Sequence, residues 1–253
     1  MPRFFVRNNQ ISDGVVTVVG DDAHHLSRSL RMAAGETVVV CDEQAREYVC
    51  ELTDFLPDRV LARVLSEQPS RAEPPFRAHV FQALPKGDKL DSIIQKAIEC
   101  GADEITTFES ERCVVRIKDA NEAKKLDRRM RIAIEAAKQS GRGRLPAVHP
   151  TVRFSEAIGK ASESALTLFC YEGEGTAPLG RVLADWRRAN PDLAAPESVS
   201  IVIGSEGGFS EAEVAQARKR GMIPIGLGAR ILRTETAASF VLACLVLEFE
   251  LSE

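Results

Sequence analysis

The hydrophobic pattern of this chain is different before and after a proline-containing segment at residues 66–75. Before this segment, short runs rich in β-branched residues predict strands at 15–19, 37–40, 47–52 and 59–65, with a helical segment at 22–32. After it, strands and helices alternate, which is typical of an α/β domain with a largely parallel sheet. We therefore expect a small β-domain over residues 1–68 and an α/β domain over residues 76–253.

The elements of the expected α/β domain follow from periodicity and end signals. Apolar residues at three- and four-residue spacing, with a serine cap or a following glycine, predict the helices. Strands are expected at 78–84, 104–108, 165–170, 198–204 and 222–227, and helices at 89–100, 120–140, 211–220 and 234–249.

Composition excludes several classes of protein. The 253 residues are 44% hydrophobic and 28% charged, as in an ordinary globular protein. No run approaches the roughly 18 apolar residues of a membrane span, and the first ten residues lack the apolar core of a secretory signal. The six Cys form no C-x-x-C pair and no His clusters with them, so we expect no metal site, no disulfide framework and a reducing cytoplasm.

The charge of the chain is unevenly distributed. The whole chain carries −4, yet the segment from Arg112 to Arg144 holds eleven Lys and Arg against four Asp and Glu. Such a basic stripe is a plausible footprint for a polyanion such as RNA. It could equally be a solvated helix face.

The sharpest local motif is IVIGSEGGFSEAEV at 201–214. An apolar strand leads into a glycine-rich loop and then into a helix, where Ser210 and Glu213 have the spacing of a capping box. Glycines let the backbone approach a ligand closely. The loop matches no phosphate-binding pattern and carries the carboxylate of Glu206, which would repel phosphate. It either binds a ligand with hydroxyl groups or positive charge, or is a tight turn without one.

A second motif, GLGARILRTETAAS at 226–239, places Arg230 and Arg233 just before a helix N-terminus. Cations at that end oppose the helix dipole and are poorly placed for stability. The two arginines are therefore either functional or partners of nearby glutamates.

Together these two motifs resemble the C-terminal signature of the SPOUT methyltransferases, the class with a deep trefoil knot. The rest of the chain resembles one family in that class, the bacterial 16S rRNA uracil-N3 methyltransferases, which modify a uridine near the decoding site. The resemblance is carried by RFFV (3–6), HHLSRSLRMAAGE (24–36), QALPKGDKLDSIIQKAIECGADEI (82–105) and EAAKQSGRGRLP (135–146). The family pattern usually has Pro at the position of Ser205.

The resemblance implies an N-terminal PUA-like RNA-binding β-barrel, a knotted α/β catalytic domain, S-adenosylmethionine as methyl donor, and a homodimer formed through the catalytic domain. It implies a cofactor pocket built from three loops at strand ends. The residues that we assign to this pocket on that basis are Phe169, Tyr171, Glu172, Ile203, Gly204, Ser205, Glu206, Gly207, Gly208, Leu227, Gly228, Ile231, Leu232, Thr234 and Ala237.

The resemblance also implies 16S rRNA in the small ribosomal subunit as the partner. Basic residues would contact its phosphates, and Phe4 could stack on a base, although a Phe beside a strand start is more often a core residue. The candidates are Arg3, Phe4, Arg7, His25, Arg28, Arg31, Lys86, Lys89, Arg142 and Arg144.

Methylation of uracil N3 requires that this nitrogen lose its proton, which leaves negative charge on the flanking carbonyl oxygens. A proton acceptor and an oxyanion stabiliser would therefore help. We expect Arg233 to be the stabiliser, and Glu235 or Glu206 to be the acceptor unless water suffices. Two other functions stay open: ribose 2′-O methylation by a related fold, and non-catalytic RNA binding in ribosome assembly.

Overall fold

The computed structural model describes residues 1–116 and 122–252. Contacts between Cα atoms divide the chain into two compact units. Met1–Glu73 and Ala137–Leu145 form the first unit, and Pro74–Ala136 and Pro146–Glu253 form the second. In the described part of the chain, no helix is long and apolar enough to span a membrane.

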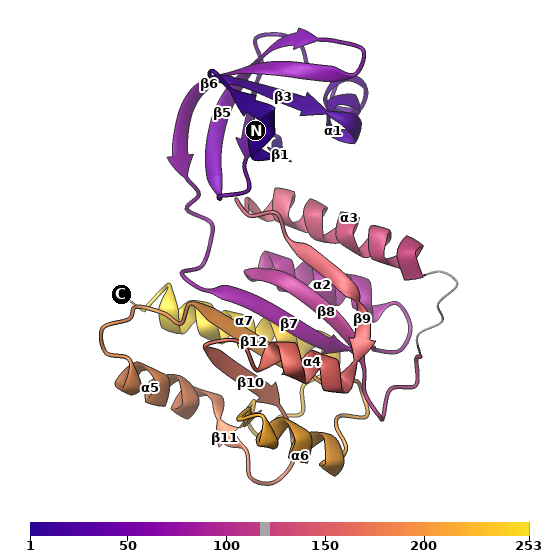
Figure 1. Cartoon of the computed structure of the whole chain (residues 1–253), viewed down its shortest axis with the longest axis vertical. Coiled ribbons are helices and arrows are strands. Elements are labelled where there is room, and N and C mark those ends of the chain that lie inside the picture. Colours follow the sequence, from indigo (N-terminus) through magenta and orange to yellow (C-terminus); the bar gives the residue numbers. More distant parts are fainter. Residues whose placement is uncertain (117–121, 253) are drawn as a thin grey trace. The chain divides into compact units, whose positions relative to one another are not determined.

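The first unit is built on a six-stranded curled sheet in the order β1-β4-β5-β6-β3-β2 (Figure 1). All neighbours in this sheet are antiparallel except β1 and β4. Alternate valines, such as Val16, Val18, Val38 and Val40, face one buried core, as the period of a strand requires. The strands are β1 (Arg3–Phe5), β2 (Ile11–Ser12), β3 (Val15–Val19), β4 (Thr37–Cys41), β5 (Arg46–Phe55) and β6 (Arg59–Pro69).

Two expectations for this unit need correction. Strand β6 pairs with β5 as far as Pro69, so the first residues of the expected linker belong to the sheet. The helical segment expected at 22–32 is instead a short helix, α1 (Gly20–His24), that runs into a π-helical turn, His25–Ser29. A short 3-10 turn, Asn8–Gln10, precedes β2.

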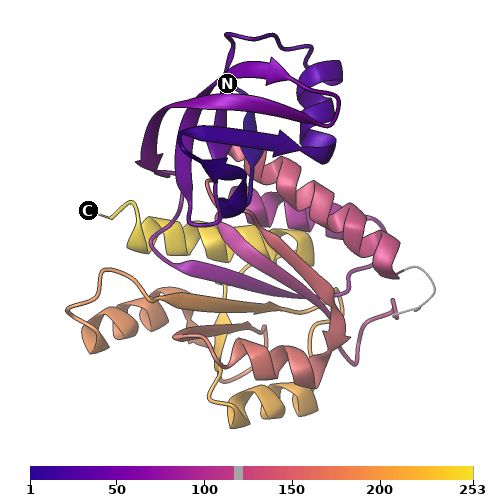
Figure 2. The same ribbon diagram turned by 45° about the horizontal axis from the view of Figure 1, so that its top comes forward.

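The second unit contains a fully parallel seven-stranded sheet in the order β11-β13-β10-β12-β7-β8-β9. In Figure 2, α2 and α7 lie together on one face of this sheet, and α4 and α6 lie on the other. The strands are β7 (Arg77–Ala83), β8 (Ala102–Glu109), β9 (Ala147–Arg153), β10 (Leu166–Cys170), β11 (Ala177–Pro178), β12 (Ser198–Ile203) and β13 (Ile223–Gly226).

The helices of this unit follow the predicted apolar spacing where it was clear. In α2 the five predicted apolar residues from Leu90 to Ile98 are all buried. The helices are α2 (Lys89–Glu99), α3 (Glu122–Ser140), α4 (Phe154–Ala161), α5 (Leu179–Ala189), α6 (Glu211–Lys219) and α7 (Thr234–Phe249). Ala120 and Asn121, with which the helix at 120–140 was expected to begin, lie outside the described residues. The predicted fold class is confirmed, whereas the knot stays a prediction.

Candidate functional site

A cavity in the second unit lies at the carboxyl ends of three neighbouring strands, β13, β10 and β12. Ligands of parallel α/β sheets bind outside this end, where loops from different strands converge. The cavity has a volume of about 780 Å³. Its walls come from the loops after the three strands, at 170–176, 203–209 and 226–234, together with Lys89, Arg112 and Ala237.

The glycine-rich loop after β12 is a tight turn. The Gly208 N–H donates a 2.9 Å hydrogen bond to the Ser205 carbonyl, and Gly208 has a φ of +63°, which favours glycine. Gly207 lies under Arg112: a Cβ atom at Gly207 would be 3.0 Å from the Arg112 Cβ. The Arg112 guanidinium in turn donates to the Gly207 carbonyl at 3.1 Å. A larger residue at 207 would therefore press against Arg112, which would have to shift.

The loop is anchored by the predicted capping box. The Glu213 N–H donates to Ser210 Oγ at 3.2 Å, and the Ser210 N–H donates to Glu213 Oε2 at 3.0 Å. The buried Glu213 carboxylate also accepts a 2.8 Å hydrogen bond from the Glu111 N–H. One side chain thus joins the start of α6 to the segment that carries Arg112.

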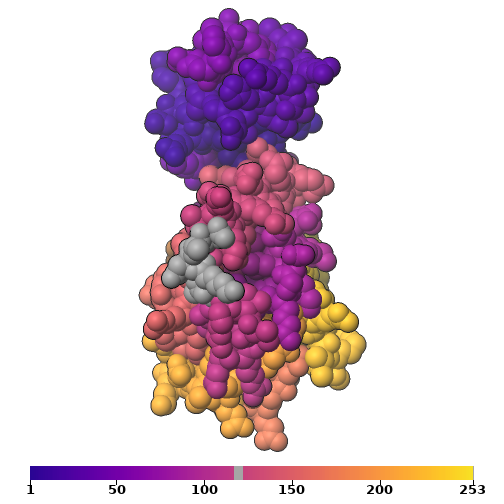
Figure 3. All heavy atoms as spheres, turned by 90° about the vertical axis from the view of Figure 1, so that its right-hand side faces the viewer, coloured from indigo at the N-terminus to yellow at the C-terminus, as the bar shows by residue number. Residues whose placement is uncertain are grey.

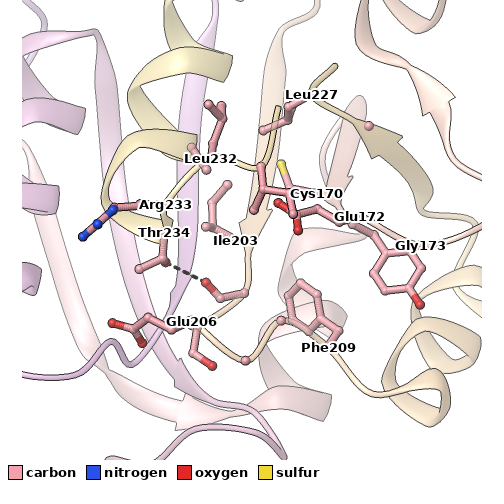
Figure 4. Close-up of a pocket in the computed structure, with 18 of the residues that line it drawn as sticks. Cys170, Glu172, Gly173, Ile203, Glu206, Phe209, Leu227, Leu232, Arg233 and Thr234 are labelled. Carbon is pink, nitrogen blue, oxygen red and sulfur yellow. Dashed lines mark hydrogen bonds between the residues drawn. The ribbon is translucent and has the colours of Figure 1, made fainter. Parts of the chain in front are cut away.

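The third loop is joined to the second by Thr234, the first residue of α7. Its hydroxyl donates a 2.7 Å hydrogen bond to the Gly204 carbonyl (Figure 4). The hydroxyl also accepts a 2.9 Å hydrogen bond from Nε2 of Gln82, a fully buried side chain at the end of β7. This buried link fixes the entrance of α7 against the strand ends.

Three charged groups meet at the rim of the cavity. Lys89 Nζ lies 3.0 Å from Glu206 Oε1 and 3.2 Å from Glu235 Oε2. Burial alone would raise the pKa of Glu206, but its own backbone N–H and Lys89 lower it below the ordinary value. The pKa of Glu235 is lowered by its own backbone N–H and then by Lys89, and hydrogen bonds to both carboxylates raise the pKa of Lys89. Both glutamates are therefore ionised at neutral pH.

Arg233 lies at the N-cap of α7 without a side-chain capping hydrogen bond. Its side chain is 81% exposed, and its Nη1 atom lies 3.9 Å from Glu235 Oε1. Figure 4 shows the guanidinium extending away from the strand-end residues Ile203 and Cys170. The arginine is therefore free to meet a molecule that approaches the cavity from outside.

The structure brings together every residue that we assigned to the cofactor pocket except Phe169. Phe169 is fully buried and packs on Phe209, with ring centroids 4.3 Å apart. Phe209, rather than Phe169, therefore lines the cavity. Four further lining residues, Cys170, Gly173, Phe209 and Ala229, lie within the three loops expected at 170–175, 204–209 and 227–237. Sequence reasoning missed Thr176, Gly226 and Arg112. Arg112 is distant in sequence from all three loops, and no local pattern could have placed it there.

The cavity fits S-adenosylmethionine in size and chemistry. Its volume lies within the roughly 300–1,000 Å³ usual for small-molecule sites. Apolar side chains such as Leu227 and Leu232 line it beside exposed loop backbone, which suits a flat adenine ring and its polar edge. The buried hydroxyl of Ser205 has no hydrogen-bond partner among the described residues and lies in the cavity wall. An unpartnered buried hydroxyl is costly unless a ligand or water completes its bonding.

Comparison with known proteins decides the family. A model of the RNA methyltransferase domain matches residues 72–246, and a model of the RNA methyltransferase PUA domain matches residues 20–65. The chain is 33% identical over 254 residues to ribosomal RNA small subunit methyltransferase E of Bacillus subtilis, covering 99% of this chain and 98% of that protein. The chain belongs to the small-subunit ribosomal RNA methyltransferase E family.

Two of the solved structures similar to this chain contain the bound cofactor. One is the methyltransferase E from Neisseria gonorrhoeae bound to S-adenosyl methionine, with a TM-score of 0.80, 32% identity and 97% of each chain covered. The other is a methyltransferase from Legionella pneumophila in complex with the same cofactor, with a TM-score of 0.79, 28% identity and 96% of each chain covered.

The residues of the first unit that were predicted to contact RNA differ in the exposure of their side chains. Arg7, His25, Arg28 and Arg31 are exposed, as is Lys86 in the second unit. Phe4 is only 1% exposed and packs beneath Lys138, whose Nζ lies 5.4 Å from the ring centre. The predicted stacking of Phe4 on a base needs correction, since its ring belongs to the core. Arg3 is largely buried and pairs with Glu47 at 2.8 Å.

Arg142 also needs correction as an RNA contact. Its side chain is only 3% exposed and forms a two-pronged ion pair with Glu73, which is 5% exposed. The Glu73 carboxylate also accepts hydrogen bonds from the N–H groups of Gly143 and Arg144. The side chain of Arg144 is 22% exposed, with Nη1 3.7 Å from Glu73. These residues all belong to the first unit and stabilise it.

Most of the remaining basic stripe lies on α3, which reaches the surface on the face shown in Figure 3, whereas Arg112 and Arg116 precede this helix. Arg129 is buried and pairs with Glu122 at 3.1 Å, and Arg128 pairs with Asp91. Lys118 lies outside the described residues. Lys124, Lys125 and Arg131 are exposed. The stripe is thus partly a set of structural ion pairs and partly an exposed basic surface.

Proposed function

We propose that this protein transfers a methyl group from S-adenosylmethionine to N3 of a uridine near the decoding site of 16S rRNA. One observation carries the proposal: three loops at adjacent parallel strand ends form a cavity of cofactor size with the exposed Arg233 at its mouth. Full-length relatives at about one-third identity bear the name of a small-subunit rRNA methyltransferase.

The cofactor would be held mainly by backbone. The loops at 203–209 and 226–232 present N–H and C=O groups between apolar side chains. Glu172 is exposed at the rim and is the candidate partner for ribose hydroxyls, whereas Glu206 is already engaged by Lys89. Burial raises the pKa of the Cys170 thiol, which therefore stays protonated and is a poor competitor for the methyl group.

When bound, S-adenosylmethionine supplies a methyl group activated by a positively charged sulfur. Arg233 would face a uracil carbonyl and gain interaction energy as N3 loses its proton. An interaction that strengthens in the transition state accelerates the reaction more than it tightens binding. Glu235 is the candidate proton acceptor, but its lowered pKa makes it a weak base, so solvent is the alternative acceptor.

The RNA would be positioned by the exposed cations Arg7, Arg28, Arg31 and Lys86, with His25 beside Arg28 in a shallow depression of the first unit. Phosphate contacts of this kind fix the register of the RNA without reading its sequence. We further propose that the protein works in the cytoplasm, where ribosomal subunits are assembled.

We also propose that two copies of the chain form a homodimer through the second unit. Helix α7 is apolar on nearly all sides, and Leu247 is 60% exposed, with Leu251 beyond the helix end 65% exposed. A helix that is apolar all round is usually buried. A partner copy packed on α7 would supply that burial.

The proposal is tested by transfer of a labelled methyl group from S-adenosylmethionine to isolated small subunits, with large subunits as the comparison. Label should enter only small-subunit RNA. Gly207→Val should abolish transfer and cofactor binding, because a branched side chain would press against Arg112 and block the close approach of the cofactor to the loop backbone. Gly180→Ala is the matched control, since a Cβ atom at Gly180 meets nothing within 4 Å. Label in large-subunit RNA, or tight cofactor binding by Gly207→Val, would overturn the assignment.

A further inference from the structure

A second cluster of chemically reactive side chains lies on strands β7, β8 and β9, which are neighbours in the sheet (Figure 1). His79 lies directly opposite Glu104, and Thr106 lies opposite His149. Side chains on paired residues share a face, as do residues two apart along a strand. The register therefore places both imidazoles, the carboxylate and the threonine hydroxyl on the same face.

The distances bring three donor atoms together. Glu104 Oε2 lies 2.7 Å from His149 Nε2 and 3.8 Å from His79 Nδ1. One donor atom from each of the three residues lies within 4.8 Å of the others. A tetrahedral zinc ion holds N and O ligands at about 2.0–2.2 Å, which separates the ligand atoms by about 3.3 Å. Small rotations of exposed side chains would suffice to reach that geometry.

The surroundings of His79 favour the role of a ligand. Its ring is stacked on Phe81, with centroids 3.9 Å apart, and its Nε2 lies 2.7 Å from the buried Thr106 hydroxyl. When Nε2–H donates to Thr106, Nδ1 is unprotonated and keeps its lone pair for a metal ion. Metal-bound histidines are commonly oriented by such a hydrogen bond from the second ring nitrogen.

The protonation states agree with this geometry. Burial lowers the pKa of His79 to about 4, so its ring is neutral at pH 7. Hydrogen bonding from His149 lowers the pKa of Glu104, so its carboxylate is ionised. The charge of Lys160 on α4 also lowers the His79 pKa, and Lys160 itself pairs with Glu156 at 3.0 Å. Neutral imidazole and ionised carboxylate are the forms that bind a metal.

We propose that His79, Glu104 and His149 form a binding site for a divalent transition-metal ion of the zinc class. Two imidazoles and one carboxylate are a donor set that zinc accepts, with the fourth position left to water. Each ligand is the third residue of its strand, toward the amino ends, whereas the methyl-transfer cavity lies at the carboxyl ends. The ion would therefore link β7, β8 and β9 and stabilise the sheet, and it would take no part in methyl transfer.

The test uses the full chain after dialysis against a chelator, in buffer with a non-thiol reductant. Calorimetry with Zn²⁺ should show one equivalent bound per chain, and Co²⁺ should give visible d–d absorption without a sulfur charge-transfer band. His149→Gln, a partly exposed position, should weaken Zn²⁺ binding by more than about 100-fold, and Thr106→Val by about 10–100-fold. Zn²⁺ should also raise the Tm of the unmodified protein and not that of His149→Gln.

The exposed histidines of the first unit give the matched control. His24→Gln and His25→Gln should each bind Zn²⁺ as the unmodified protein does. Three results would overturn the proposal: no Zn²⁺ binding by the unmodified protein, full binding by His149→Gln, or a sulfur charge-transfer band with Co²⁺. The first would show that the cluster is only a hydrogen-bonded network, and the last would assign the ion to cysteines.

Discussion

The Thr234 hydroxyl donates a 2.7 Å hydrogen bond to the carbonyl oxygen of Gly204, and so joins the first residue of α7 to the end of β12. Because Gln82 donates to the same hydroxyl, the removal of one oxygen atom would leave two polar groups without this partner. The shape of the cavity between the two loops depends on this link.

Thr234→Val should therefore destabilise the protein and weaken cofactor binding together. Gln82 Nε2 keeps its 2.9 Å hydrogen bond to the Ala83 carbonyl and lies 3.5 Å from the Gly204 carbonyl, so neither group loses all its partners. The free energy of unfolding should fall by about 1–2 kcal/mol. Thr234→Ser keeps the hydroxyl and should retain most of both properties. Thr236→Val, at an exposed position two residues on, is the control. Urea unfolding and calorimetry measure the effects, and an undisturbed Thr234→Val variant would refute the role of the link.

The ion pairs of Lys89 should make the free energy of unfolding depend on pH in the acid range. The pKa values of Glu206 and Glu235 are lowered in the folded protein, so their ion pairs with Lys89 contribute stability above the ordinary glutamate pKa of about 4.3. This contribution is lost as pH falls through the lowered values. Lys89→Met should be less stable than the unmodified protein at pH 7, and the difference should shrink in acid.

Urea unfolding across pH measures this dependence. Lys96→Met, on an exposed position of the same helix, is the matched control and should show no comparable pH dependence. A stability difference for Lys89→Met that stays constant into acid would contradict the assignment of the ion pairs.

Arg142→Ala should lower the free energy of unfolding and leave the affinity for RNA unchanged. Loss of one partner of a buried ion pair typically costs about 3–5 kcal/mol, and the hydrogen bonds that Glu73 keeps from Gly143 and Arg144 favour the lower end. Arg144→Ala, at a more exposed position, should cost less. Thermal unfolding measures both. An Arg142→Ala protein of full stability but reduced affinity for RNA would restore Arg142 to the RNA-binding surface.

Arg233→Ala should slow the chemical step while the protein stays folded and binds cofactor. Loss of an oxyanion donor costs about 10²–10³ in rate. Lysine should rescue only in part, because it lacks the planar fork of arginine, and higher pH should help because N3 deprotonates more readily. Arg181→Ala, a similarly exposed position on α5, is the control. If single-turnover rates are unchanged and RNA affinity falls, Arg233 is a phosphate contact.

Local sequence patterns predicted the parts of the fold that have strong periodicity or clear ends. Helix α7 begins at Thr234 and ends at Phe249, as expected from its apolar run, but the expected threonine cap is wrong: the N-cap residue is Arg233, without a side-chain capping hydrogen bond. No element was predicted at β9, α4, β11 or α5. Two of these have weak patterns: β9 contains Pro150 and a polar His149 at the edge of the sheet, and the apolar face of α5 is narrow, with Leu179, Val182 and Leu183 buried.

The candidate site was predictable where it lies within one loop and not where distant segments meet. The glycine loops were visible in the sequence, but Arg112 reaches Gly207 across 95 residues. In the same way, His79, Glu104 and His149 are far apart in sequence and are brought together only by the order and register of β7, β8 and β9. No residue spacing could have predicted that cluster.

The most direct test of the account identifies the methylated atom. Small subunits are incubated with the protein and S-adenosylmethionine, and the rRNA is then digested to nucleosides and mapped by mass spectrometry. The account predicts one 3-methyluridine near the decoding site, absent when Gly207→Val replaces the unmodified protein. A 2′-O-methylated nucleoside, or no methylation by protein that binds small subunits, would contradict it.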